Sequence, residues 1–223
     1  MSRSSLAALF ALGACTYPSW ELDSETQLKC DPENPCPADY FCTGGTSTSG
    51  TCYREGLVGC ANQPLSRYWG FDADDEGWSF DYDNASGAIG DMTWTRAVGT
   101  PREGALQIQF MGTARTERLA WIRPPSPIGD VTAKTISARI WSERAGLLAK
   151  PYIHNGNGSA GWTDGGAFQL DPQRWTCVTL DVENPSYTDP VRVLDAGHVY
   201  ELGFQIDGMV GGATTIVIDD VGY

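Results

Sequence analysis

Strict alternation of apolar and polar side chains is the pattern that most restricts how this chain can fold. It is clear at 106–110, 136–141 and 202–207, where every second side chain is apolar. A period of two is typical of strands with one buried face. Gly, Pro and Asp clusters such as 124–130 separate these stretches, and no window has the period of an amphipathic helix. We therefore expect roughly nine or ten antiparallel strands in residues 66–223, forming a β-sandwich or jelly roll.

Three landmark segments mark the course of this region. YWGFDADDEGW at 68–78 opens it, WTCVTL at 175–180 lies late in it, and TIVIDDV at 215–221 closes it. This order resembles the jelly-roll carbohydrate-binding modules of the galactose-binding-like superfamily. The resemblance covers nearly all of residues 66–223 and implies a glycan-binding module. It also implies that Trp78 and Trp175, at landmark positions, pack in the core.

The same resemblance implies a structural calcium ion. In related modules the opening and closing strands lie side by side, and an acid from each helps to hold Ca²⁺. By position these acids are Asp72 and Asp219. Calcium takes six to eight oxygen ligands, so backbone carbonyls, with Asp74 or Asp220, would complete the shell. The alternative is that both acids are solvated ends of strands.

The polar faces of the expected strands carry side chains suited to sugar. Aromatic rings offer stacking area to a pyranose, and planar polar groups bond to its hydroxyls. We expect Trp141, Tyr152 and His154 to form the core of a cleft, with Trp162 at its edge. The polar ligand contacts expected beside them are Arg139, Gln205 and Asp207. Alternation alone does not show whether these strands are neighbours, and an ordinary solvent face is the alternative.

The first residues indicate export. A basic start at 1–3 precedes an apolar run at 6–12 that is too short to span a bilayer. Leu12-Gly13-Ala14-Cys15 resembles the lipobox of bacterial lipoproteins, which implies a signal peptide over 1–14 and a lipid-modified Cys15. We expect a tether over 15–29 and an anchor in the bacterial outer membrane or at the cell surface. An ordinary secretory signal is the alternative.

A cysteine-rich segment at 30–62 follows, without helical or strand periodicity. Such a segment needs cross-links to fold, and export permits disulfides. The six cysteines other than Cys15 allow about 15 connectivities, and they are Cys30, Cys36, Cys42, Cys52, Cys60 and Cys177. The spacing resembles small EGF-like modules, which implies Cys30–Cys42 and Cys36–Cys52, with Cys60 left to join Cys177. A zinc site is disfavoured because there is no CxxC pair and no nearby His.

Charge and motifs narrow the function. The net charge of −13 disfavours nucleic acid and anionic polysaccharides as partners. No serine-hydrolase elbow, zinc-protease motif or phosphate loop is present. Residues 115–119 resemble the arginine strand of jelly-roll polysaccharide lyases, but the other lyase motifs are missing. We therefore expect a non-catalytic carbohydrate-binding lipoprotein for neutral glycans. The alternatives are a structural or adhesive envelope protein, and a polysaccharide lyase or glycoside hydrolase.

Overall fold

The computed structural model describes most of the main domain and part of the segment before it. The described residues are 29–36, 40–42, 50–54, 59–72, 74–82, 89–96, 104–113, 118–156 and 161–223. The expected signal peptide, the lipid-modified Cys15 and the lyase-like residues 115–117 lie outside these ranges and stay predictions. Within the described ranges, no helix has both the length and the apolar character that a membrane crossing needs.

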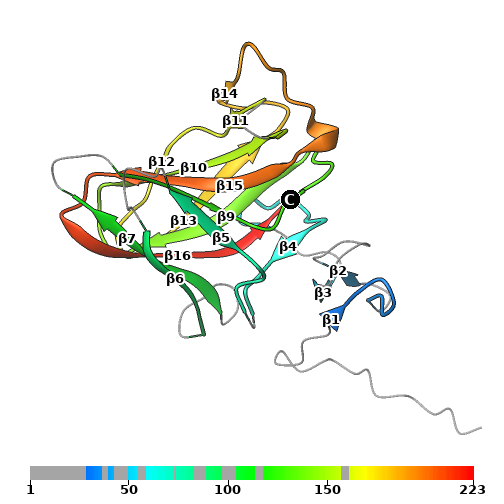
Figure 1. Cartoon of the computed structure of the whole chain (residues 1–223), viewed down its shortest axis with the longest axis horizontal. Helices are drawn as coiled ribbons and strands as arrows, with labels where there is room; N and C mark the ends of the chain where they lie inside the picture. Colours follow the sequence, from blue (N-terminus) through cyan, green and yellow to red (C-terminus); the bar gives the residue numbers. More distant parts are fainter. Residues whose placement is uncertain are drawn as a thin grey trace, which may run out of the picture.

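Two antiparallel sheets pack face to face as a β-sandwich (Figure 1). The six-stranded sheet has the order β13-β9-β16-β7-β6, with β4 beside β16. Its strands are β4 (Tyr68–Trp69), β6 (Ile89–Thr95), β7 (Ala105–Gly112), β9 (Thr135–Ser142), β13 (Trp175–Asp181) and β16 (Gly212–Gly222). The expected all-β sandwich is thereby confirmed.

The seven-stranded sheet has the order β14-β11-β10-β15-β8-β5, with β12 beside β10. Its strands are β5 (Ser79–Tyr82), β8 (Arg118–Arg123), β10 (Leu147–His154), β11 (Thr163–Asp164), β12 (Phe168–Gln169), β14 (Tyr187–Thr188) and β15 (Glu201–Gly208). A single 3₁₀ turn, η1 (Ala196–His198), is the one helical element among the described residues. Several strands have only two residues, too short to show alternation, so the sandwich has more strands than the sequence predicts.

The core lies between the two sheets and is built from the side chains that alternation assigns to it. Leu106, Ile108 and Phe110 of β7 are all fully buried. Burying an aliphatic or phenyl side chain of this size contributes about 1.5–3 kcal/mol. Trp78, which directly precedes β5, stacks on Phe204 of β15 with ring centroids 6.2 Å apart and is only 3% exposed. The expectation that Trp78 belongs to the core is therefore confirmed.

Trp175, in contrast, is not a core residue. Val178 and Leu180 of β13 are fully buried, and the period of two then directs Trp175 to the outer face of the six-stranded sheet. There it lies directly opposite Trp141 of β9, and both side chains are partly exposed. The landmark match correctly identifies the strand but assigns the tryptophan to the wrong face.

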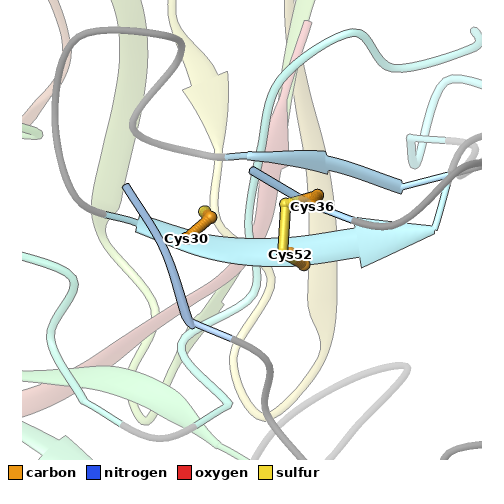
Figure 2. Close-up of side chains that lie close together, drawn as sticks. All are labelled: Cys30, Cys36 and Cys52. Atoms are coloured by element: carbon orange, nitrogen blue, oxygen red, sulfur yellow. A yellow bond between two sulfur atoms is a disulfide. The ribbon is translucent and has the colours of Figure 1, made fainter. Parts of the chain in front are cut away.

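The cysteine-rich segment contains a small antiparallel sheet of order β1-β3-β2, which the sequence did not predict. Its strands are β1 (Lys29–Cys30), β2 (Tyr40–Cys42) and β3 (Gly50–Arg54). Figure 2 shows the disulfide Cys36–Cys52. Its two Cα atoms are 5.5 Å apart. Cys30 is also disulfide-bonded, but the side chain of Cys42, its expected partner, lies outside the described residues. Because Cys30, Cys36 and Cys52 are all disulfide-bonded, their sulfur atoms are not available to bind a metal ion.

The expected disulfide between Cys60 and Cys177 is confirmed and joins this segment to strand β13. Beside it, Gln63 donates a side-chain hydrogen bond to the Ser137 hydroxyl on β9. Ser137 is on the outer face of the six-stranded sheet, yet it is fully buried, because residues 59–63 lie over it. Part of that outer face is therefore already covered by the chain itself. Strands β1–β3 lie beyond β4, on the side away from β11 and β14 (Figure 1).

Candidate functional site

The seven residues predicted to bind sugar lie on both sheets. Arg139 and Trp141 are on β9 of the six-stranded sheet, whereas Tyr152 and His154 are on β10 of the seven-stranded sheet. The connection over 143–146 passes from one sheet to the other instead of forming a hairpin. The expected cleft with Trp141 beside Tyr152 is therefore wrong. The other five residues share the outer face of the seven-stranded sheet.

A buried polar network occupies the centre of that outer face. The Tyr152 hydroxyl donates to Oε1 of Glu201 over 2.8 Å, and His154 Nε2 lies 3.3 Å from the same oxygen. The backbone N–H of Gly156 donates to His154 Nδ1 over 3.4 Å. Because Nδ1 accepts, the hydrogen of a neutral ring is on Nε2, which donates to Glu201. Sequence reasoning missed Glu201, which lies at the start of β15 with no motif around it.

Arg123 of β8 completes the network from the other side. Its guanidinium forms an ion pair with Oε2 of Glu201. Burial opposes the charge on Glu201, but the hydrogen bonds from His154 and Tyr152 and the charge of Arg123 outweigh it. The pKa of Glu201 is therefore lowered below its ordinary value. Glu201 is an ionised carboxylate with donors on both oxygens.

A glycine makes this arrangement possible. Gly203 of β15 pairs directly with Tyr152 of β10. A Cβ atom at Gly203 would lie 2.7 Å from the Tyr152 hydroxyl oxygen, well inside van der Waals contact. The missing side chain therefore lets the phenol ring lie across β15 and reach Glu201.

Trp162 covers the network from the solvent side. Its ring stacks on Tyr152, with centroids 4.3 Å apart and planes at 13°. Its indole N–H donates to Oδ2 of Asp164 over 3.0 Å. Under this cover Tyr152 is only 1% exposed and His154 only 7%. The expectation that these two rings present a stacking surface is therefore wrong, because their faces are already packed within the protein.

The partly exposed side chains of this face lie beside the network. Trp121 and Arg123 alternate with the buried Ile122 on β8, so both point outward. In the paired register Trp121 lies opposite Gln205, and Gln205 lies opposite Lys150. The alternation in 118–123 also predicts that Trp121 and Arg123 point outward. Positive charge at both ends of this stretch obscures the pattern.

Gln205 and Asp207 extend the row along β15, with Gln205 Nε2 donating to Asp207 Oδ2 over 3.3 Å. Trp162 stands over β10, and Trp121 is on β8. Strand β15 lies between β10 and β8, so the strands beneath the two indole rings are two spacings of about 4.8 Å apart. Gln205 and Asp207 are on the strand between, whereas Lys150 is on β10 and Arg123 is on β8. We define the ligand face as Trp121, Arg123, Lys150, Trp162, Gln205 and Asp207.

The two acids proposed for calcium belong to segments that continue from two paired strands, β4 and β16. Strand β4 pairs with β16, with Trp69 opposite Val221. Because the pairing is antiparallel, Asp72 and Asp219 lie towards the same end of the pair. Asp219 is 1% exposed. Among the described residues, neither acid belongs to a cluster of three or more acidic, His or Cys side chains, so calcium at these acids would need backbone carbonyls to complete its shell.

Comparisons with known proteins find similar folds among solved structures. No family model matches the sequence, and no curated protein matches it. A carbohydrate-binding module from a study of promiscuous specificity in the β-sandwich superfamily superposes with a TM-score of 0.52 at 17% identity. The match covers 78% of this chain and 66% of the other, so the chain spans just under two thirds of that structure.

A family 11 carbohydrate-binding module of a Clostridium thermocellum cellulosomal cellulase matches with a TM-score of 0.49 at 15% identity, over 75% of this chain and 96% of the module. A family 30 module from another cellulase of the same organism matches with a TM-score of 0.48 at 10% identity, over 69% and 95%. At 17% identity the first of these matches shows the β-sandwich fold alone.

Proposed function

We propose that this protein is a non-catalytic carbohydrate-binding protein, and that the glycan lies on the ligand face of the seven-stranded sheet. The observation that carries the proposal is the set of partly exposed Trp121, Trp162 and Arg123 on one face of a sandwich with the fold of carbohydrate-binding modules. Indole rings stack against the apolar faces of sugar rings, and the guanidinium and amide groups bond to hydroxyls.

The buried network favours binding over catalysis. A general acid or base must reach the proton that it transfers. Tyr152 and His154 are the groups on this face most suited to proton transfer, but both are buried and directed at Glu201. They are placed to stiffen the face, and a stiff face loses little entropy when a ligand binds.

Neutral glycans are the ligand class that we propose. The net charge of −13 repels polyanions, and the ligand face itself mixes both signs. We further propose that the protein is exported and attached to the outer membrane or cell surface through acyl chains on Cys15. A structural Ca²⁺ held by Asp72 and Asp219 belongs to the same proposal.

A glycan array of neutral glucans, mannans and galactosides tests the binding function. We expect wild-type protein to retain at least one of them, and Trp121→Ala to weaken binding about tenfold or more, equivalent to about 1.4 kcal/mol. Trp141→Ala is the matched control, because it removes a partly exposed indole from the other sheet and should leave binding unchanged. Thermal melts establish that both variants are folded.

Two outcomes contradict the proposal. Retention of no glycan by wild-type protein would remove the binding function, and equal losses in the two variants would remove the assignment to the seven-stranded sheet. Release of reducing ends or unsaturated sugars from a retained glycan would instead show catalysis.

A further inference from the structure

Arg123 differs from the other members of the buried network in being at the surface. Its side chain is 33% exposed, whereas that of Glu201 is only 7% exposed. On β8 it is two residues from Trp121 on the same face, a distance of about 6.6 Å along the strand. A sugar ring stacked on Trp121 would therefore have its hydroxyls within reach of the guanidinium.

Stability alone gives little reason for this network. A buried ion pair recovers its desolvation cost only with excellent geometry, and an apolar replacement of similar volume is often as stable. Here three side chains, Tyr152, His154 and Arg123, bond to one buried carboxylate. The effect of that arrangement is to hold the Arg123 guanidinium in one orientation at the surface.

We propose that Arg123 determines which sugar is bound, an inference that rests on the proposed function. Glu201 is the residue that positions Arg123. Together the two select a neutral sugar with two adjacent hydroxyls over a uronic acid. A guanidinium presents parallel N–H donors that match two adjacent oxygens. Glu201 both fixes that geometry and cancels the positive charge that would otherwise attract a carboxylate.

The charges around Arg123 also favour a neutral sugar over a uronate. Among the side chains described on this face, Lys150 is the other cation, and Asp164, Asp207 and Glu201 are the anions. A uronate bound at Arg123 would meet no excess of positive charge. It would also place its carboxylate near Glu201, and like charges at such short range disfavour binding.

The experiment compares affinities for a neutral glucan, mannan or galactan and for polygalacturonate, measured by calorimetry with the full chain. We expect wild-type protein to bind the neutral polymer at least tenfold more tightly. In Glu201→Gln the uncompensated Arg123 should lower this ratio at least tenfold, through weaker neutral binding and stronger polygalacturonate binding. Glu183→Gln is the control: it removes one negative charge from an exposed turn outside the ligand face, and should change the ratio less than threefold.

A folded Glu201→Gln variant with an unchanged ratio would overturn the inference. If Glu201→Gln does not fold, Arg123→Gln provides the test. An Arg123→Gln protein that binds the neutral polymer as tightly as wild type would also overturn the inference. Wild-type preference for polygalacturonate would overturn the selection of neutral sugars while leaving the carbohydrate-binding function intact. Failure of wild-type protein to bind any of these polymers would instead count against the proposed function itself.

Discussion

Gly203 lies directly opposite Tyr152 on the neighbouring strand, so that the phenol ring occupies the space where a side chain at 203 would stand. A methyl group there must displace the ring, and overpacking of this kind costs about 1–3 kcal/mol. We therefore expect Gly203→Ala to lower the free energy of unfolding by that amount in urea denaturation. Gly156→Ala is the control, because nothing lies within 4 Å of a Cβ at Gly156. Equal stability of the two variants would show that Tyr152 does not need this space.

Glu201 makes the stability of the protein depend on pH in a defined direction. Its pKa in the folded state is lowered from an ordinary value of 4.5, so the folded protein holds the ionised form more strongly than the unfolded chain does. The stabilisation is fully present above that ordinary value and is lost as the pH falls through the lowered pKa. We expect the difference in unfolding free energy between wild type and Glu201→Gln to be constant near neutral pH and to shrink below about pH 4.5.

Urea denaturation at a series of pH values measures this difference. Glu183→Gln, which removes a carboxylate from an exposed turn, controls for the general effect of one charge. A wild-type advantage over Glu201→Gln that grows on acidification would contradict the direction of the shift.

The disulfide Cys60–Cys177 encloses a much longer loop than Cys36–Cys52, with sequence separations of 117 and 16. Cross-linking a longer loop restricts the unfolded chain more, so replacing Cys60 and Cys177 by Ser should cost the sandwich about 2–5 kcal/mol. Replacing Cys36 and Cys52 by Ser should leave the unfolding transition of the sandwich unchanged. Comparison of the two double variants by tryptophan fluorescence in urea measures the effect, and equal losses would contradict it.

Calcium, if held by Asp72 and Asp219, should stabilise the folded state, because an ion that binds only the folded protein shifts the unfolding equilibrium. We expect EDTA to lower the Tm of wild-type protein by several degrees and to leave the Tm of Asp219→Asn unchanged. Asp181→Asn, which changes an exposed acid, should respond to EDTA like wild type. An unchanged wild-type Tm, together with no heat on adding Ca²⁺, would remove the site.

The sequence predicts the sandwich because alternation reports directly on burial. Ile136, Ala138 and Ile140 are assigned inward and are all fully buried. Alternation does not report which sheet a strand joins. A four-residue connection such as 143–146 suits a hairpin as well as a crossing between sheets, so Trp141 and Tyr152 could not be separated in advance.

The candidate site was harder to predict than the fold. Tyr152 and His154 are on the outward face as predicted, but the outward face of a strand is not always exposed. A loop residue, Trp162, covers both, and its stacking on Tyr152 depends on a chain path that local periodicity does not encode. Glu201 is an ordinary carboxylate in the sequence and becomes the centre of a network only when β8, β10 and β15 are adjacent.

The bond between Cys60 and Cys177 also determines how tension passes through the molecule. A pull between the N-terminal segment and Tyr223 travels along the chain to Cys60, crosses the sulfur atoms to Cys177, and continues through β13 to β16. The residues between the two cysteines, including β4 to β12, lie outside this load path while the bond is intact. Of the strands that carry the ligand face, only β15 is on this covalent path, so force can extend the chain of β8 and β10 only after the disulfide is broken.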